Sequence, residues 1–169
     1  MAEELVDLVD GNDNVVGAAT IRKCLEEGLL HRAVAVLVER GNGRFILQQR
    51  SKKDRWQPGL WTLSSTGHVR SGETYDSAAA RELHEELGIR AELDRLNKYL
   101  LPPISNEGLT EREWVTLYSG VSDSSLSVDP VELEVAEEVD FARAREMIDE
   151  GLITPDAAFL LGEYLRLRT

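Results

Sequence analysis

The stretch GHVRSGETYDSAAARELHEELGI, residues 67–89, decides the fold, because it predicts a glycine-containing loop that leads into an acidic helix. If residues 75–87 are helical at about 100° per residue, Glu82, Glu85 and Glu86 share one face. Most glutamate runs form only a solvated helix surface. Here, however, like charges four residues apart repel, and anions are disfavoured near a helix C-terminus. A divalent cation would remove this repulsion, since Mg²⁺ is commonly bound by carboxylates together with substrate phosphates.

The other side of the predicted helix indicates packing against a sheet. Leu83 and Leu87 fall on one stripe with Ala79 and Ala80, and the small members would let the helix approach a sheet closely. Gly88 is a typical helix stop. The sequence therefore predicts one apolar face and one carboxylate face on the same helix.

The loop before the helix is expected to be fixed to it by an ion pair. Arg81 should reach back to Glu73 and bind its carboxylate through two hydrogen bonds, which is a positioning role. Gly67 and Gly72 indicate a sharply bent loop that can offer a backbone carbonyl oxygen to the same cation.

Alternating apolar and polar runs predict strands before and after this helix. A hairpin is expected at residues 3–21, then a short helix that stops at Gly28, then two strands at 32–40 and 44–50 that form a second hairpin at the centre of a sheet. Further strands are expected at 96–102, 113–121 and 132–141, and helices at Phe141–Asp149 and Pro155–Leu167. This order predicts a mixed α/β (α+β) fold in which helices cover a sheet.

Length and composition favour one globular domain over residues 1–169, with the N-terminal hairpin at about 1–30 and the C-terminal helices at about 140–169. The net charge of −12 disfavours stable nucleic-acid binding. Any anionic substrate would need bridging cations or a local basic patch. A single cysteine, no secretion signal and no apolar run of about 20 residues predict a cytoplasmic protein without a membrane span. The oligomeric state stays open.

The quoted stretch has a fixed spacing of glycine, acidic and arginine positions. It runs Gly67, five residues, Glu73, seven residues, Arg81-Glu82-Leu83, one residue, Glu85-Glu86, one residue, Gly88-Ile89. This pattern resembles the complete signature of the Nudix hydrolases and should arise by chance with a probability on the order of 10⁻⁹ or less per starting position. The resemblance implies an α/β/α sandwich with a mixed central sheet. It also implies Mg²⁺- or Mn²⁺-dependent hydrolysis of a diphosphate linkage in a small organic diphosphate, such as a nucleoside diphosphate derivative.

The same resemblance assigns roles to residues of the signature. It implies that Glu82, Glu85 and Glu86 bind the metal, that Gly67 offers its carbonyl, and that Glu73 and Arg81 support the geometry. A bound metal lowers the pKa of a water molecule that attacks phosphorus, and a glutamate acts as the general base. Glu85 is the first choice for this base within the signature. Outside it the candidates are Glu107, Glu111, Glu113, Glu137 and Glu138, each of which is more often a solvated surface residue.

A second resemblance extends over most of residues 5–120. The segments LVDGNDNVVGAAT, GLLHRAVAVLV, LQQRS and PGLWTLSSTGHV are similar to those of type I isopentenyl-diphosphate isomerases and the Nudix subgroup closest to them. In those isomerases histidines and glutamates bind a metal, and His31, His68, Glu111 and Glu113 fall on matching positions. This implies a second metal site, although a lone histidine beside a strand is more often structural. Cys24 stands where another histidine ligand is expected.

Two departures favour a hydrolase over an isomerase. The isomerases use a cysteine just before the Gly-His pair, and this chain has Thr66 there, whose hydroxyl is a poor substitute for a thiol. The isomerases also tend to have an eroded hydrolase signature, whereas this one is intact. The alternatives are isopentenyl-diphosphate isomerisation and a non-catalytic module that binds a phosphorylated ligand.

A basic segment before two tryptophans is the candidate for substrate binding. Arg50, Lys52, Lys53 and Arg55 precede Trp56 in a loop that follows a strand. Arg50 is the best phosphate ligand among them because it ends a strand and can bind bidentately. Lys53 and Arg55 are further candidates, and Trp56, Trp61 or Trp114 could stack on a base, although tryptophans are at least as often core residues.

Overall fold

The computed structural model describes residues 3–168, so the expected domain ends at residues 1 and 169 lie outside the described part. The described residues form ten strands and four helices. The strands are β1 (Leu5–Val9), β2 (Val15–Thr20), β3 (Leu30–Glu39), β4 (Phe45–Arg50), β5 (Trp61–Thr62), β6 (Ser65–His68), β7 (Asp94–Leu100), β8 (Ile104–Asn106), β9 (Leu109–Val121) and β10 (Leu133–Val139). The helices are α1 (Ile21–Glu27), α2 (Tyr75–Leu87), α3 (Phe141–Asp149) and α4 (Pro155–Arg168).

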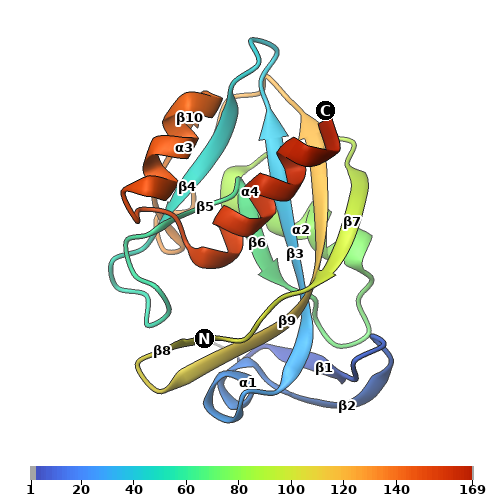
Figure 1. Cartoon of the computed structure of the whole chain (residues 1–169). Coiled ribbons are helices and arrows are strands. Elements are labelled where there is room, and N and C mark those ends of the chain that lie inside the picture. The colour runs from blue at the N-terminus through green and yellow to red at the C-terminus, as the bar shows by residue number, and fades with distance from the viewer. Residues whose placement is uncertain (1–2, 169) are drawn as a thin grey trace.

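Strand β3 is the centre of a mixed sheet (Figure 1). It runs parallel to β9 from Leu30↔Arg112 to Glu39↔Val121, and antiparallel to β6 from Ala33↔His68 to Val36↔Ser65. Strand β7 extends the sheet beyond β9, while β4 pairs with β10 and β5. The β1–β2 hairpin joins the start of β3 at Leu8↔His31. The mixed sheet with covering helices confirms the predicted fold class.

Two apolar cores form on opposite faces of β3. Val34, Val36 and Val38 pack in the core that contains α2, whereas Ala33, Ala35 and Leu37 pack in the core that contains α3 and α4. Successive side chains of a strand point to opposite faces, so a strand covered on both faces reads as a continuous apolar run. The chain therefore builds an α/β/α sandwich (Figure 1).

The prediction of a second hairpin between β3 and β4 is correct only at its closed end. The two strands pair in register only at Glu39↔Phe45 and then separate. The Ser64 hydroxyl lies between them, because it accepts a hydrogen bond from Val38 N at 2.8 Å and donates one to Ile46 O at 2.6 Å. A buried side chain thus takes the place of the ladder, and β6 becomes the neighbour of β3 instead.

Helix α2 has the predicted bounds and a corrected apolar face. Thr74 accepts a hydrogen bond from Ser77 N at its start, and Gly88 ends it with a φ of 69°. Ala79, Leu83 and Leu87 are buried as expected, but Ala80 is exposed and Ala78 is buried in its place. The face of α2 that packs on the sheet therefore includes Ala78 and not Ala80. None of the helices in the described part is long and apolar enough to cross a membrane.

Candidate metal and substrate cleft

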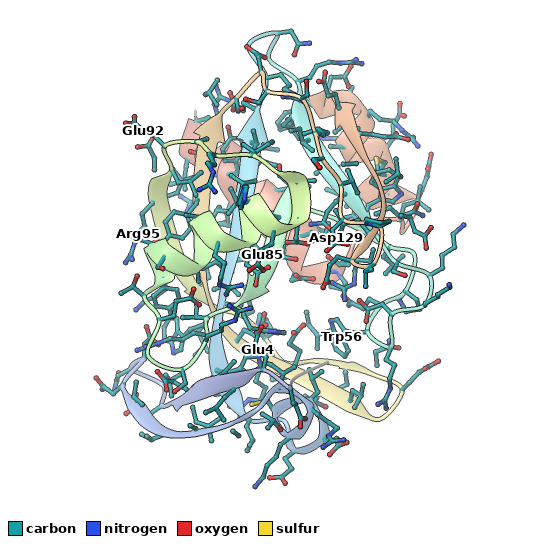
Figure 2. All side chains as sticks on the ribbon, turned by 180° about the vertical axis from the view of Figure 1, so that it is seen from behind. Glu4, Trp56, Glu85, Glu92, Arg95 and Asp129 are labelled. Carbon is teal, nitrogen blue, oxygen red and sulfur yellow. The ribbon has the colours of Figure 1, made fainter. Side chains whose placement is uncertain are left out.

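A cleft of about 450 Å³ opens beside the C-terminal half of α2. Figure 2 shows Glu4, Glu85 and Trp56 around its opening, contributed by the N-terminal segment, α2 and the loop between β4 and β5. Its lining includes nine carboxylates, from Glu4, Asp54, Glu82, Glu85, Glu86, Glu111, Glu113, Glu132 and Asp156. Only two arginines and one histidine accompany them, namely Arg50, Arg70 and His68. The cleft would therefore repel a diphosphate unless cations were bound in it.

Among the three clustered glutamates of α2, Glu86 makes the most hydrogen bonds. Its side chain accepts hydrogen bonds from Gln48 Nε2 at 2.9 Å, from the Ser65 hydroxyl at 2.7 Å and from Thr66 N at 3.1 Å. Burial raises the pKa of Glu86 to about 8, and the charge of Glu82 adds to this rise, while the hydrogen bonds oppose it. A carboxylate held in place yet costly to ionise is a good ligand for a cation that would compensate its charge.

Glu82 lies against the backbone of Gly67, which the sequence had placed in a loop. Gly67 is instead inside β6, at the register position Val34↔Gly67. A Cβ atom there would lie 2.2 Å from the Glu82 Cδ atom, so only glycine leaves space for this carboxylate. Burial raises the pKa of Glu82 to about 7, and Arg81 partly offsets this. The glycine is needed here for a close side-chain approach and not for an unusual φ.

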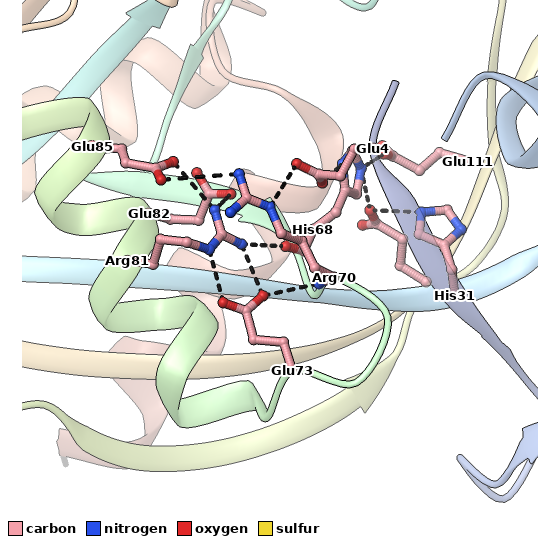
Figure 3. Close-up of polar contacts among 10 residues, drawn as sticks. Glu4, His31, His68, Arg70, Glu73, Arg81, Glu82, Glu85 and Glu111 are labelled. Atoms are coloured by element: carbon pink, nitrogen blue, oxygen red, sulfur yellow. Dashed lines mark hydrogen bonds and ion pairs between the residues drawn. The ribbon is translucent and has the colours of Figure 1, made fainter. Parts of the chain in front are cut away.

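The expected ion pair between the loop and α2 is present. Arg81 donates from Nε to Glu73 Oε1 at 2.8 Å and from Nη2 to Glu73 Oε2 at 3.0 Å (Figure 3). Its Nη1 donates to Glu82 at 2.8 Å and to Glu85 at 3.2 Å, and its Nη2 also donates to the His68 carbonyl. One guanidinium thus orients Glu82 and Glu85 and ties β6 to the helix. Glu85 itself is about half exposed at the mouth of the cleft.

A second group of ligand-type side chains lies on the other side of Gly67. One ligand atom from each of His31, His68, Glu111 and Glu113 lies within 4.8 Å of all the others. His31 sits on β3 and His68 on β6, which pair directly, and the two glutamates come from β9, the other neighbour of β3. The sheet pairing therefore assembles residues that are up to 82 positions apart, from His31 to Glu113.

The orientation of His31 fits a metal ligand. Its Nδ1 lies 2.8 Å from the Leu29 carbonyl, so it carries the proton and donates. Its Nε2 is buried without a hydrogen-bond partner among the described residues, 3.5 Å from Glu113 Oε1. A backbone carbonyl on one nitrogen and a second nitrogen turned toward other ligand-type atoms is the usual arrangement of a metal-bound imidazole. Without a cation, burial alone would lower the pKa of His31, but Cys24 and Glu113 raise it to about 9.

His68 and the two glutamates have spacings that also fit a shared cation. His68 Nε2 lies 3.5 Å from Glu111 Oε1 and 3.5 Å from Glu113 Oε1. Atoms bound about 2.1 Å from one ion lie roughly 3.0–3.5 Å from each other, which agrees with these separations. Burial, and then the charge of Glu113, raise the pKa of Glu111 to about 7. Burial would also raise the pKa of Glu113, but the two histidines lower it.

The two groups are connected by a chain of charged side chains (Figure 3). Arg70 lies 4.0 Å from Glu85 and 3.4 Å from Glu4, and the other oxygen of Glu4 is 3.7 Å from His68 Nδ1. Arg70 thus places a positive charge between Glu4 and Glu85 in this acidic cleft. No sequence pattern pointed to Glu4, because it precedes β1 and its place at the cleft depends on how the β1–β2 hairpin joins β3.

The predicted substrate-binding residues divide into two sets. Arg50 and Trp56 line the cleft, whereas Lys53 and Arg55 are exposed and are not part of its lining. Arg50 donates to Asp54 Oδ2 and to the Trp56 carbonyl, so it fixes the loop that carries Trp56. Trp114 donates to the Asp10 carbonyl and therefore has a structural contact of its own.

The remaining candidates take different places. Glu107, Glu137 and Glu138 are exposed and do not line the cleft, while Thr66 does. Cys24 is buried and interacts with His31, but its sulfur is not among the four ligand atoms of the second group. Cleft residues that sequence reasoning missed are Glu4, Gln48, Glu132 and Asp156. Of these only Gln48 left a signal, as a polar residue that directly follows the apolar run of residues 45–47.

Comparisons with known proteins relate the chain to one family model and to similar proteins. The family model described as NUDIX domain matches residues 29–159. An isopentenyl-diphosphate Delta-isomerase of Serratia proteamaculans is 33% identical over 154 residues, covering 91% of this chain and 84% of that protein. An uncharacterised Nudix hydrolase of Pseudomonas aeruginosa is 33% identical over 153 residues, covering 90% and 86%.

Solved structures share the fold. A crystal structure from Deinococcus radiodurans aligns with a TM-score of 0.80 at 24% identity, covering 95% of this chain and 98% of that one. The NUDIX domain of Shewanella oneidensis NrtR, solved with ADP ribose, aligns with a TM-score of 0.66 at 16% identity, covering 83% and 88%. At these identities the likeness concerns the fold alone.

Proposed function

Because the chain belongs to the Nudix family, we propose that it is a divalent-metal-dependent hydrolase that cleaves a diphosphate linkage by attack of water on phosphorus. The observation that carries this proposal is the convergence of Glu82, Glu85 and Glu86 on one cleft, where Gly67 leaves room for a carboxylate. A site with nine carboxylates can accept a diphosphate only together with cations. Mg²⁺ and Mn²⁺ suit such an oxygen-rich donor set.

Different residues of the cleft would bind the cation, accept a proton and bind the phosphates. Glu82 and Glu86 would bind the cation together with the Gly67 carbonyl. Arg81, itself held by Glu73, orients Glu82, whereas Gln48, Ser65 and Thr66 orient Glu86. A bound cation neutralises phosphate charge and lowers the pKa of water. Glu85, half exposed at the mouth and held by Arg81, accepts the proton of the attacking water. Arg50 and Arg70 line the cleft and are placed to bind the phosphates.

The group of His31, His68, Glu111 and Glu113 is proposed as a second cation site. Its support is the buried Nε2 atom of His31, which has no hydrogen-bond partner among the described residues, and the close approach of all four ligand atoms. Two imidazoles and two carboxylates suit a transition metal such as Mn²⁺ better than Mg²⁺, which prefers oxygen ligands and retained waters.

Isopentenyl-diphosphate isomerisation is the second candidate, because relatives at about a third identity carry that name and this group is present. Isomerisation needs one group that donates a proton to carbon and another that removes one. The residue before Gly67 is Thr66, whose hydroxyl is a weak acid at neutral pH. The proposal therefore stays with hydrolysis.

The test is a panel of nucleoside diphosphates, nucleotide sugars and isoprenoid diphosphates with Mg²⁺ or Mn²⁺ in H₂¹⁸O. Hydrolysis should occur on at least one member, place ¹⁸O in a phosphate product, and fall by about 10²-fold or more in Glu85→Gln, as expected for loss of a general base. Glu92→Gln is the matched control, because Glu92 is exposed and lies away from the cleft (Figure 2). Conversion of isopentenyl to dimethylallyl diphosphate without hydrolysis would overturn the proposal in favour of an isomerase. Stabilisation by ligands without any turnover would overturn it in favour of a binding module.

A further inference from the structure

Asp156 lies in the first turn of α4 and lines the same cleft as the carboxylates of α2. It approaches from α4, whose core is on the other face of the sheet from the core of α2. Its Oδ1 atom is buried and has no hydrogen-bond partner among the described residues. Asp156 is thus a carboxylate inside the cleft that neither the proposed metal groups nor the signature uses.

Two polar residues near Asp156 make hydrogen bonds of their own. Thr154 accepts the Ala157 N–H, as a cap of α4. Arg50, the cation on this side of the cleft, donates to Asp54 and to the Trp56 carbonyl. Burial, and then the charge of Glu113, raise the pKa of Asp156, although Thr154 and the Asp156 N–H favour its ionised form. A buried hydrogen-bond acceptor without a donor destabilises the folded protein. Such an acceptor is typically retained where a bound ligand supplies the donor.

Other residues that line the same cleft indicate which ligand group could do so. Trp56 and Gln57 line the cleft too and are only 7% and 8% exposed. Gln57 has a φ of 46°, a strained value for a residue other than glycine, which is the kind of strain that binding sites retain. An indole ring, a side-chain amide and a carboxylate together match a ring with hydroxyl or amino donors.

Resting on the proposed hydrolase function, we infer that Asp156 is a specificity-determining residue that accepts a hydrogen bond from a hydroxyl or amino group of the substrate's organic moiety. The chemistry selects nucleoside or sugar diphosphates and rejects isoprenoid diphosphates, whose hydrocarbon chains have no donor. A hydrocarbon in this position would bury Asp156 Oδ1 unpaired. Sites built around a polar contact reject analogues that lack it far more strongly than apolar pockets reject an extra group.

A purely structural role is the competing explanation, because acidic residues in the first turn stabilise a helix through its dipole. Asp156→Glu separates the two roles. Glutamate keeps the charge in the first turn of α4 but moves the carboxylate by one methylene group. The structural role predicts unchanged kinetics in this variant, whereas recognition predicts a loss of at least about 10-fold in kcat/KM on a donor-bearing substrate.

The experiment compares wild type, Asp156→Glu and Asp156→Leu on CDP, ADP, GDP, UDP, UDP-glucose and geranyl diphosphate. Asp156→Leu should lose about 100-fold or more in kcat/KM on the best donor-bearing substrate, mainly through KM, and should retain or gain activity on geranyl diphosphate. Its melting temperature should not fall, since an unpaired buried carboxylate is removed. Asp140→Leu is the matched control, because Asp140 caps the start of α3 outside the cleft and should lower stability without changing this preference.

Equal losses on both substrate classes, or no loss on either, would overturn the inference while leaving the hydrolase proposal intact. If wild type hydrolyses none of these compounds, the hydrolase proposal fails by itself. Asp156 is then tested by calorimetric binding of adenosine α,β-methylene diphosphate in Mg²⁺. Binding at least 10-fold tighter by wild type than by Asp156→Leu supports the inference, and equal binding overturns it.

Discussion

The carboxylate of Glu82 occupies the space where a side chain at Gly67 would begin, with only 2.2 Å between an ideal Cβ atom and the Glu82 Cδ atom. This contact joins β6 to α2 at the point where the two ligand groups meet, because His68 follows Gly67 directly. The atoms in conflict belong to the far end of a flexible side chain and not to backbone. A methyl group at position 67 should therefore displace Glu82 without breaking the sheet.

Gly67→Ala is expected to lower metal affinity and hydrolysis by about 10–100-fold while the melting temperature changes little, as for other changes that misplace a metal ligand. Activity at saturating Mg²⁺ and a Mn²⁺ binding titration measure this. Gly162→Ala is the control, since nothing lies within 4 Å of a Cβ there, and alanine in α4 should raise stability by about 0.5–1 kcal/mol. A large loss of stability in Gly67→Ala would contradict the account.

Arg81→Lys should reduce both stability and activity, because lysine keeps the charge but cannot bind Glu73 through two nitrogens. Arg81 is 16% exposed and Glu73 13%, so we expect a loss of about 2–3 kcal/mol, below the roughly 3–5 of a fully buried pair. Urea unfolding measures it. Arg95→Lys is the control, because its ion pair with Asp76 is exposed and should contribute less than about 1 kcal/mol. Equal effects of the two variants would refute the special role of Arg81.

The raised pKa of Glu86 predicts how stability depends on pH without metal. The pKa of Glu86 rises from its ordinary value of 4.5 to about 8 in the native state. The native state therefore binds this proton more tightly than the unfolded chain does. The free energy of unfolding should therefore fall as pH rises from about 5 to 9. Glu86→Gln should flatten this fall, whereas Glu92→Gln should retain it. Urea unfolding in EDTA at pH 5, 7 and 9 measures the slopes, and identical slopes in wild type and Glu86→Gln would show the prediction to be wrong.

His31→Gln should remove one bound Mn²⁺ per chain, because it replaces the buried Nε2 lone pair that faces Glu113. Titration of free Mn²⁺ by electron paramagnetic resonance counts the bound ions. Glu111→Gln should have the same effect and guards against a folding defect of the buried His31 variant. His84→Gln is the control, since His84 is exposed and outside the cleft. Unchanged Mn²⁺ stoichiometry in both cleft variants would exclude this second site.

The local parts of the fold could be predicted because neighbouring residues determine them. The bounds of α2 follow from Thr74 and Gly88 at its ends, and the ion pair of Arg81 with Glu73 needs only the loop–helix spacing. The separation of β3 from β4 could not be predicted, since the Ser64 hydroxyl that replaces their ladder arrives from a later segment.

The candidate site shows the same division between local and long-range information. The carboxylates of α2 were evident from helical periodicity, whereas the second group was found only by resemblance, because it depends on which strands become neighbours of β3. No sequence pattern marked Asp156 as a cleft residue, because its place in the cleft depends on how α4 packs across the sheet. Gly67 was placed in a loop because glycine usually marks turns, while here it leaves space for Glu82.

The most direct test of the account is anomalous X-ray diffraction from crystals soaked in Mn²⁺ with a non-hydrolysable diphosphate. We expect an anomalous peak within about 2.5 Å of carboxylate oxygens of Glu82 and Glu86, in contact with the diphosphate. A saturated soak with no peak at these carboxylates would contradict the central claim.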